Sequence, residues 1–205
     1  MRDIFEPKSF LKLLIEVVLI GLGVFLALLA DQWRDEHQHR ENAREILHYF
    51  REEIAANQKA VQNERDYHQK LLQDVESFET SDRPKTLPSF MTDVHFNGVH
   101  PITFEQTARD LALANQSLSY LNPQLAYGIS RVYTRQQALQ TLQYSFLQTA
   151  FIPSTYASPD ATGFVTAMKN YLIDVNIQES DLLRSYSDLL PQIDAASSPG
   201  AKPRR

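Results

Sequence analysis

The sequence predicts an all-α protein, in which a single N-terminal transmembrane helix continues into a long helix and joins an antiparallel helical bundle of about four helices. Residues 10–30 are almost entirely apolar, residues 31–79 contain no proline or glycine, and the later apolar residues recur every three or four positions. The predicted divisions are a short tail (1–9), a transmembrane helix (10–30), a long helix (31–79), an ordered loop (80–102), a helical bundle (103–190) and a disordered tail (191–205).

The apolar segment at residues 10–30 has the length of a membrane span. Its 21 residues make roughly 31 Å of helix, which matches the hydrocarbon core of a bilayer. Glu16 is the acidic residue that interrupts it. Lys12 at one end, and Trp33 and Arg34 at the other, are expected at the membrane interface, where basic and aromatic side chains are enriched.

A cleaved signal peptide is the rival interpretation of this segment. Cleavage after Ala30 is disfavoured because Leu28 stands where a small residue is preferred and Glu16 lies in the apolar region. Basic residues on the two sides of the span are nearly balanced in number. Since a very short N-terminal tail is most simply left in the cytoplasm, we expect a single-pass protein of the bacterial inner membrane with its C-terminal domain in the periplasm.

One face of the predicted span carries its acidic residue together with its small residues. Their spacing by three, four or seven places them on one side of a helix, and the members of this face are Glu16, Ile20, Gly23, Ala27 and Ala30. Small residues allow two helices to approach closely, and an intramembrane carboxyl group usually faces a partner or a cavity. Two interpretations stay open: a helix–helix interface, of which proton or ion movement is a special case, or a Glu16 side chain that reaches toward the headgroups.

The long helix after the span has a seven-residue pattern with apolar ends and a polar middle. Its two sets of positions are Leu47, Ile54, Val61, His68 and Val75, and Phe50, Asn57, Glu64, Leu71 and Phe78. The polar middle favours a bundle helix over a pure coiled coil. We expect His68 to be a hydrogen-bonded histidine of the bundle, which partial burial would make sensitive to pH.

Prolines and glycines divide the remainder of the chain. Residues 80–102 form a loop whose apolar side chains are expected to pack on the bundle, and a helical block is predicted at 103–120, with Leu111 and Leu113 among its apolar positions. Asn122 followed by Pro123 predicts the start of a helix at 123–150. The last helix is predicted at about 161–190.

Two segments resemble a family of short single-pass bacterial membrane proteins of unknown function. The first is the span, through Glu16, Gly21, Gly23, Ala27, Leu28, Asp31 and Trp33, and the second is TARDLALANQSLSYLNPQLAYGISRVY at 107–133. Glycine is common in that family before the Leu-rich turn, whereas this chain has Asn115-Gln116, which argues against a sharp left-handed turn there. The resemblance implies a membrane-anchored helical protein and transfers no activity.

Composition excludes several classes of function. The chain has 205 residues, no cysteine and a net charge of −5, so thiol chemistry and nucleic acid as a main partner are not expected. No catalytic or cofactor-binding motif is present, and we expect neither enzymatic activity nor a cofactor. The Glu45/His48 pair fits an exposed helix face better than a di-iron site. Asp93, His95 and His100 are a weak candidate for a metal site.

Three functions remain compatible with the sequence. The first is a membrane-anchored interaction or scaffold module that self-associates through its transmembrane helix. The second is an accessory subunit of a larger membrane transport or energised complex, in which Glu16 contacts a partner helix. The third is an extracytoplasmic ligand sensor. The expected partners are therefore the lipid bilayer and either a second copy of the chain or another membrane protein.

Overall fold

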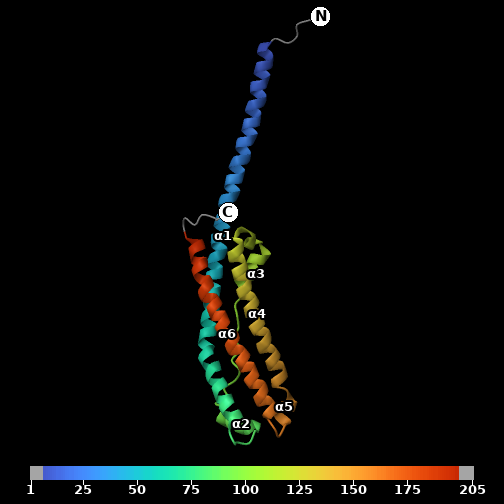
Figure 1. Ribbon diagram of the computed structural model, residues 1–205. Helices are drawn as coiled ribbons and strands as arrows, with labels where there is room; N and C mark the ends of the chain where they lie inside the picture. The colour runs from blue at the N-terminus through green and yellow to red at the C-terminus, as the bar shows by residue number, and fades with distance from the viewer. Residues whose placement is uncertain (1–6, 199–205) are drawn as a thin grey trace.

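The computed structural model describes residues 7–198, which form six α-helices and one 3-10 helix and contain no β-strand (Figure 1). The predicted all-α class is therefore confirmed. The elements are α1 (Pro7–Thr80), α2 (Leu87–Asp93), α3 (Thr107–Ala114), η1 (Ser117–Tyr120), α4 (Pro123–Ala150), α5 (Pro153–Ala157) and α6 (Thr162–Ser197). Three of them, α1, α4 and α6, are long. Residues 1–6 and 199–205, which belong to the two predicted tails, lie outside the described part.

Helix α1 is continuous from the apolar segment to the far end of the bundle. Its N-terminal part stands clear of every other element, whereas its C-terminal half packs against α6 (Figure 1). The seven-residue pattern of the sequence is confirmed for this half, because all its positions are buried except Glu64, which is half-buried.

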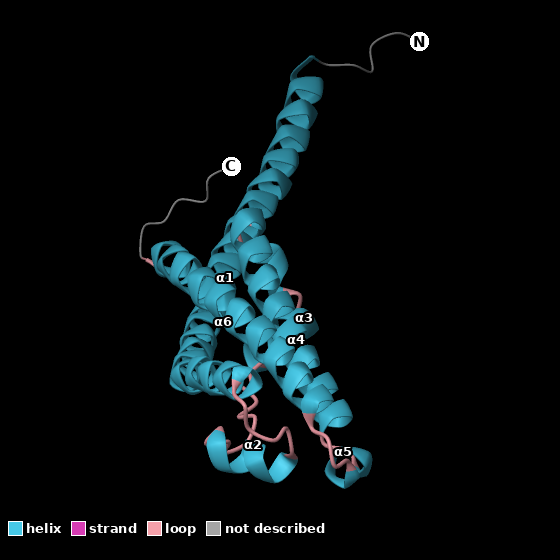
Figure 2. Ribbon diagram, turned by 60° about the horizontal axis from the view of Figure 1, so that its bottom comes forward, coloured by secondary structure: helices cyan, strands magenta, loops and turns pink. Residues whose placement is uncertain are grey.

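The contacts of α6 fix the directions of the three long helices. Pairs between α1 and α6 run in opposite order along the two helices: Arg51 with Asp194, His68 with Glu179, and Glu79 with Lys169. Helix α4 also runs opposite to α6, since Gln136 meets Tyr186 and Phe146 stacks on Tyr171. Helices α1 and α4 therefore point the same way, and residues 81–122 return the chain between them (Figure 2).

The helices of the returning chain are placed differently from those that its sequence predicts. The expected loop at 80–102 contains α2, which begins where Thr86 accepts a hydrogen bond from the backbone N–H of Ser89. Residues 94–106 then run outside any helix. The block predicted at 103–120 is helical only as α3 and η1, and α3 turns Ala108 and Ala112 inward while Leu111 and Leu113 stay exposed. Small alanines allow α3 to lie close against α1.

The turn between α3 and η1 corrects an expectation drawn from the family resemblance. Gln116 adopts the left-handed conformation with φ = 58°, although it is not a glycine. The side chain of Asn115 accepts a hydrogen bond from the backbone N–H of Ser117 at 3.2 Å, and the Gln116 carbonyl accepts one from Ser119 at 3.1 Å. These bonds offset the conformational cost, which is about 1 kcal/mol for a residue with a Cβ.

Helix α4 begins where the sequence predicts it, whereas α6 ends later than predicted. Helix α4 begins as predicted, because the side chain of Asn122 accepts from the N–H of Gln124 at 2.9 Å and Pro123 occupies the first turn. Helix α6 continues through Pro191 to Ser197, beyond the predicted end at residue 190. Pro191 lies on the exposed side, where water can satisfy the freed carbonyl of Ser187, while Ile193 is fully buried.

Candidate functional site

The predicted helix–helix face lies on the part of α1 that no other described element covers. Within residues 14–33 every side chain is exposed, which includes Glu16, Ile20, Gly23, Ala27 and Ala30. A Cβ added to Gly23 would meet nothing within 4 Å. Ala27 and Ala30 line a shallow open depression together with Val24, Leu28, Asp31 and Arg34. The face is therefore free to meet lipid or another chain.

The residues expected at the membrane interface flank this segment. Lys12 is exposed at one end. At the other end Trp33 is 73% exposed and its ring stacks on that of His37 at 6.1 Å, while Arg34 pairs with Asp31 at 3.1 Å. By length and composition, α1 contains one segment apolar enough to cross a membrane.

A second candidate site is a set of buried polar groups inside the bundle. Near α3, the carboxylate of Glu53 accepts hydrogen bonds from the hydroxyl of Tyr133 and from the backbone N–H of Ala108, the latter at 2.7 Å. One turn further along α1, Asn57 donates to the Glu105 carbonyl and accepts from the Glu105 N–H, both at 2.9 Å. These contacts attach the return segment to α1.

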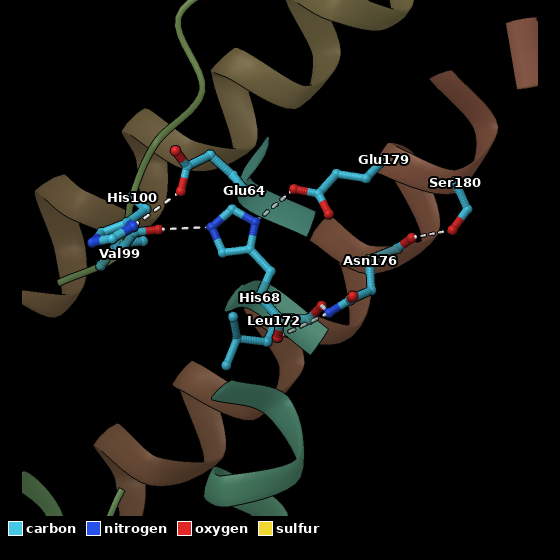
Figure 3. A network of polar contacts seen from close by, with 8 residues as sticks. All are labelled: Glu64, His68, Val99, His100, Leu172, Asn176, Glu179 and Ser180. Carbon is cyan, nitrogen blue, oxygen red and sulfur yellow. Dashed lines mark hydrogen bonds and ion pairs between the residues drawn. The ribbon is translucent and has the colours of Figure 1, made fainter. Parts of the chain in front are cut away.

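His68 is the centre of the largest group of buried polar contacts (Figure 3). Its side chain and that of Glu179 are both fully buried, and Nδ1 lies 2.6 Å from the Glu179 carboxylate. On the other side of the ring, Nε2 lies 3.0 Å from the backbone carbonyl of Val99. His68 thus joins α1 to α6 and to the return segment.

The geometry restricts where protons reside on His68. A carbonyl only accepts, so Nε2 must carry a hydrogen toward Val99. Burial lowers the pKa of His68. The hydrogen bond and charge of Glu179 outweigh burial, with smaller contributions from Val99 and Glu64, so that this pKa lies above its ordinary value of 6.5. An imidazolium paired with a carboxylate is the charge state that these contacts favour.

A second histidine lies beside this group in a more exposed setting. His100 contacts Glu64 through Nδ1 and the Asn97 carbonyl through Nε2, each at 3.0 Å, and about a third of its side chain is exposed. Its ring stacks on that of Tyr67 at 4.2 Å. The hydroxyl of Tyr67 donates to the Gly98 carbonyl at 2.6 Å, so both aromatic rings hold the same stretch of backbone.

The other chemical candidates of the sequence are not brought together. Asp93 pairs with Arg83, His95 faces Asp74 at 3.8 Å, and His100 is engaged with Glu64. Among the side chains that the structure describes, no group of three His, Asp or Glu residues has the arrangement of a metal site. Glu45 accepts from Tyr49, and His48 faces Glu52 at 3.4 Å, both on the exposed side of α1.

Sequence reasoning identified His68 but not its partners. Glu179 is 111 positions away on α6, and Val99 contributes only a backbone carbonyl. The sequence of α6 did contain a pattern that predicts a buried acidic residue. Glu179 follows Val175 by four positions and precedes Leu182 by three, which places it on the buried face of the helix. Pairing that residue with His68 required the register of the two helices.

Comparisons of this chain with protein-family models, curated proteins and solved structures found no match.

Proposed function

We propose that this protein is a membrane-anchored helical interaction module whose copies associate through one face of its transmembrane helix. The observation that carries the proposal is the isolated apolar part of α1, where no side chain between residues 14 and 33 is covered by another described element. A helix that is apolar on all sides and unburied in its own fold requires lipid or a partner.

The composition of one face favours a partner in addition to lipid. At about 100° per residue, the five residues Glu16, Ile20, Gly23, Ala27 and Ala30 fall within an arc of about 80°. Gly23 and Ala27 form a small-residue pair at a spacing of four, which permits close approach of a second helix. A carboxyl group that faces hydrocarbon is expensive, whereas an interface supplies polar partners for Glu16.

The bundle packs on another side of α1 and leaves the Glu16 face uncovered. Phe50, Ile54 and Val61 of α1 point into the bundle core. On a straight helix they lie about 160–200° around from Glu16, so the bundle occupies the opposite side of α1. Two copies that meet through the Glu16 face would carry their bundles outward, without a clash between them.

The same proposal gives the protein its place in the cell. Residues 10–30 cross the bacterial inner membrane once, Lys12 lies at one interface, and Trp33 and Arg34 lie at the other. The short N-terminal tail is cytoplasmic, and the bundle is periplasmic. Since α1 is one continuous helix, an association within the membrane is transmitted directly to the bundle.

The molecular mass of the protein in mild detergent tests the proposal, with the two glycines of the span as a matched pair. Gly23 lies on the Glu16 face, whereas Gly21 lies about 140° away from Glu16, and an added Cβ at either position meets nothing. We expect a defined oligomer for the wild type, its loss in Gly23→Leu and in Glu16→Leu, and its retention in Gly21→Leu. A wild-type monomer, or equal effects of Gly23→Leu and Gly21→Leu, would rule out self-association through this face.

The role of an accessory subunit is the second candidate, and the same open face supports it. A heterologous partner helix that contacts Glu16 would satisfy the carboxyl group equally well. In that case the chain is monomeric in detergent but is isolated from membranes in a fixed ratio with other membrane proteins. Gly23→Leu then removes those partners while Gly21→Leu keeps them.

A further inference from the structure

We propose that His68 and Glu179 hold one shared proton that keeps residues 94–106 attached to α1, and that loss of this proton at raised pH releases that segment. The inference concerns the bundle alone and does not depend on self-association in the membrane.

The two contacts of the imidazole define the number of protons in the pair. Nε2 donates to the Val99 carbonyl at 3.0 Å, and a second proton must lie in the 2.6 Å contact between Nδ1 and Glu179. That proton belongs either to an imidazolium beside a carboxylate or to a neutral imidazole beside a carboxylic acid. The pair is electrically neutral in both cases, which suits its complete burial.

Removal of the shared proton breaks one of the two contacts. If Nε2 keeps its hydrogen, the lone pair of Nδ1 faces a carboxylate. If the hydrogen moves to Nδ1, the lone pair of Nε2 faces the Val99 carbonyl. The pair would also become a buried negative charge, and such a charge is costly without a full set of partners. Oε2 of Glu179 is already buried without a hydrogen-bond partner in the described structure.

The return segment is held by its own buried apolar side chains, Val99, Ile102 and Phe104, and by hydrogen bonds from side chains of α1 to its backbone. Between residues 95 and 105 the described backbone makes no hydrogen bond to another backbone group. Three side chains of α1 hold it instead: Asn57 at Glu105, Tyr67 at Gly98, and His68 at Val99. Tyr67 and His68 hold residues 98–99, and of these two side chains His68 is the buried one. Loss of its proton therefore affects the segment more than loss of an exposed contact would.

The ionisable neighbours of the pair come from each element packed around it. Helix α1 contributes Glu64 and also Arg65, whose guanidinium donates to Ser180, the residue after Glu179. Helix α6 contributes Tyr171, whose pKa is raised by burial and by the charge of Glu179. The return segment contributes His100, which contacts Glu64 (Figure 3).

The direction of the pH effect follows from the raised pKa of His68. A histidine whose pKa is higher in the folded state contributes stability that is fully present below the unfolded value of about 6.5. This contribution is lost as the pH rises through the folded value. The segment is therefore held most firmly below about pH 6.5, and it is released as the pH rises to the folded pKa of His68.

Hydrogen exchange of the full-length protein in detergent, measured from pH 6 to pH 10, tests the proposal. After correction for intrinsic exchange, amides of residues 94–106 are expected to open about tenfold more for each pH unit between the unfolded value of about 6.5 and the folded pKa of His68, and to level off above the folded pKa. Amides of α4 between residues 129 and 146 serve as the internal reference and are expected to stay protected.

Two substitutions of glutamate by glutamine distinguish the buried His68–Glu179 pair from the more exposed His100–Glu64 pair. In Glu179→Gln, the new amide donates to Nδ1 of a neutral His68, whose Nε2 still donates to Val99, so both contacts persist without an ionisable proton. We expect the segment to stay protected and its opening to become independent of pH. Glu64→Gln is the matched control at His100. Because Glu64 is the smallest contributor to the raised pKa of His68, this variant is expected to keep a pH-dependent opening, with its midpoint moved slightly to lower pH.

The proposal is overturned if wild-type residues 94–106 open no faster at pH 10 than at pH 6 relative to α4. It is also overturned if Glu179→Gln keeps the wild-type pH dependence, or if Glu64→Gln alone abolishes it. Should Glu179→Gln fail to fold, the wild-type pH series decides by itself.

Discussion

At the scale of single residues, the bundle depends on buried polar side chains that act across helices. Glu53, Asn57 and His68 lie successively along α1, and each is buried and hydrogen-bonded to another part of the chain. A buried polar group without a partner costs more than a hydrogen bond gains, so these contacts select one register of the helices. Apolar contacts at the same positions would allow the helices to shift along one another.

Tyr133 provides a test of this role. Burial and the hydrogen bond to Glu53 raise the pKa of Tyr133, which keeps its hydroxyl protonated as a donor. Tyr133→Phe leaves one oxygen of the buried Glu53 without its donor. We expect the free energy of unfolding to fall by about 1–3 kcal/mol, measured by denaturant titration in detergent.

Tyr144→Phe is the matched control for this substitution, because Tyr144 lies on the same helix and is 55% exposed. Its unfolding free energy is expected to equal that of the wild type. Equal stabilities of the Tyr133 and Tyr144 variants would show that the Glu53 contact contributes nothing.

The residues of the candidate sites were only partly predictable. The seven-residue spacing of α1 was enough to place His68 and Asn57 inside the bundle, because helical periodicity alone decides which face is buried. Their partners were not predictable. Val99 and Glu105 act through the backbone, which has no sequence signature, and Glu179 is brought to His68 by tertiary packing.

At the scale of secondary structure, local signals decided which elements could be predicted. The start of α4 was specified by Asn122-Pro123, which caps a helix through local chemistry. A loop packed on the bundle was predicted at 80–102, and Val94, Val99 and Ile102 are indeed buried. The path of its backbone was not predictable, because hydrogen bonds from Tyr67 and His68 of α1 help to set it. The helical phase of α3 was misjudged, since its alanines face the core and its leucines face solvent.

The extension of α6 beyond Pro191 makes a prediction at this scale. Ile193 is fully buried, so Ile193→Ala is expected to reduce the free energy of unfolding by about 2–5 kcal/mol in a denaturant titration. Gln192→Ala, at the neighbouring exposed position, is the control and should leave stability unchanged. Indistinguishable stabilities for the two variants would mean that residues 191–197 are not packed against the bundle.

At the scale of the whole molecule, one helix belongs to two environments. Residues 14–33 of α1 are exposed on all sides, and the second half of the same helix packs against α6 in the bundle (Figure 1). At about 100° per residue, the buried Phe50, Ile54 and Val61 fall on the side of α1 opposite Glu16. A membrane-anchored module of this form would associate through the open side of α1 and hold its bundles apart.

Disulfide cross-linking in native membranes tests this central claim most directly, because the chain contains no cysteine. Single cysteines at Gly23 and Ala27 lie on the Glu16 face, whereas cysteines at Gly21 and Phe25 lie about 140–180° away from Glu16. We predict efficient oxidation to covalent dimers for Gly23→Cys and Ala27→Cys and little for Gly21→Cys and Phe25→Cys. Cross-linking that is equal at all four positions, or absent at Gly23 and Ala27, would contradict the proposed face.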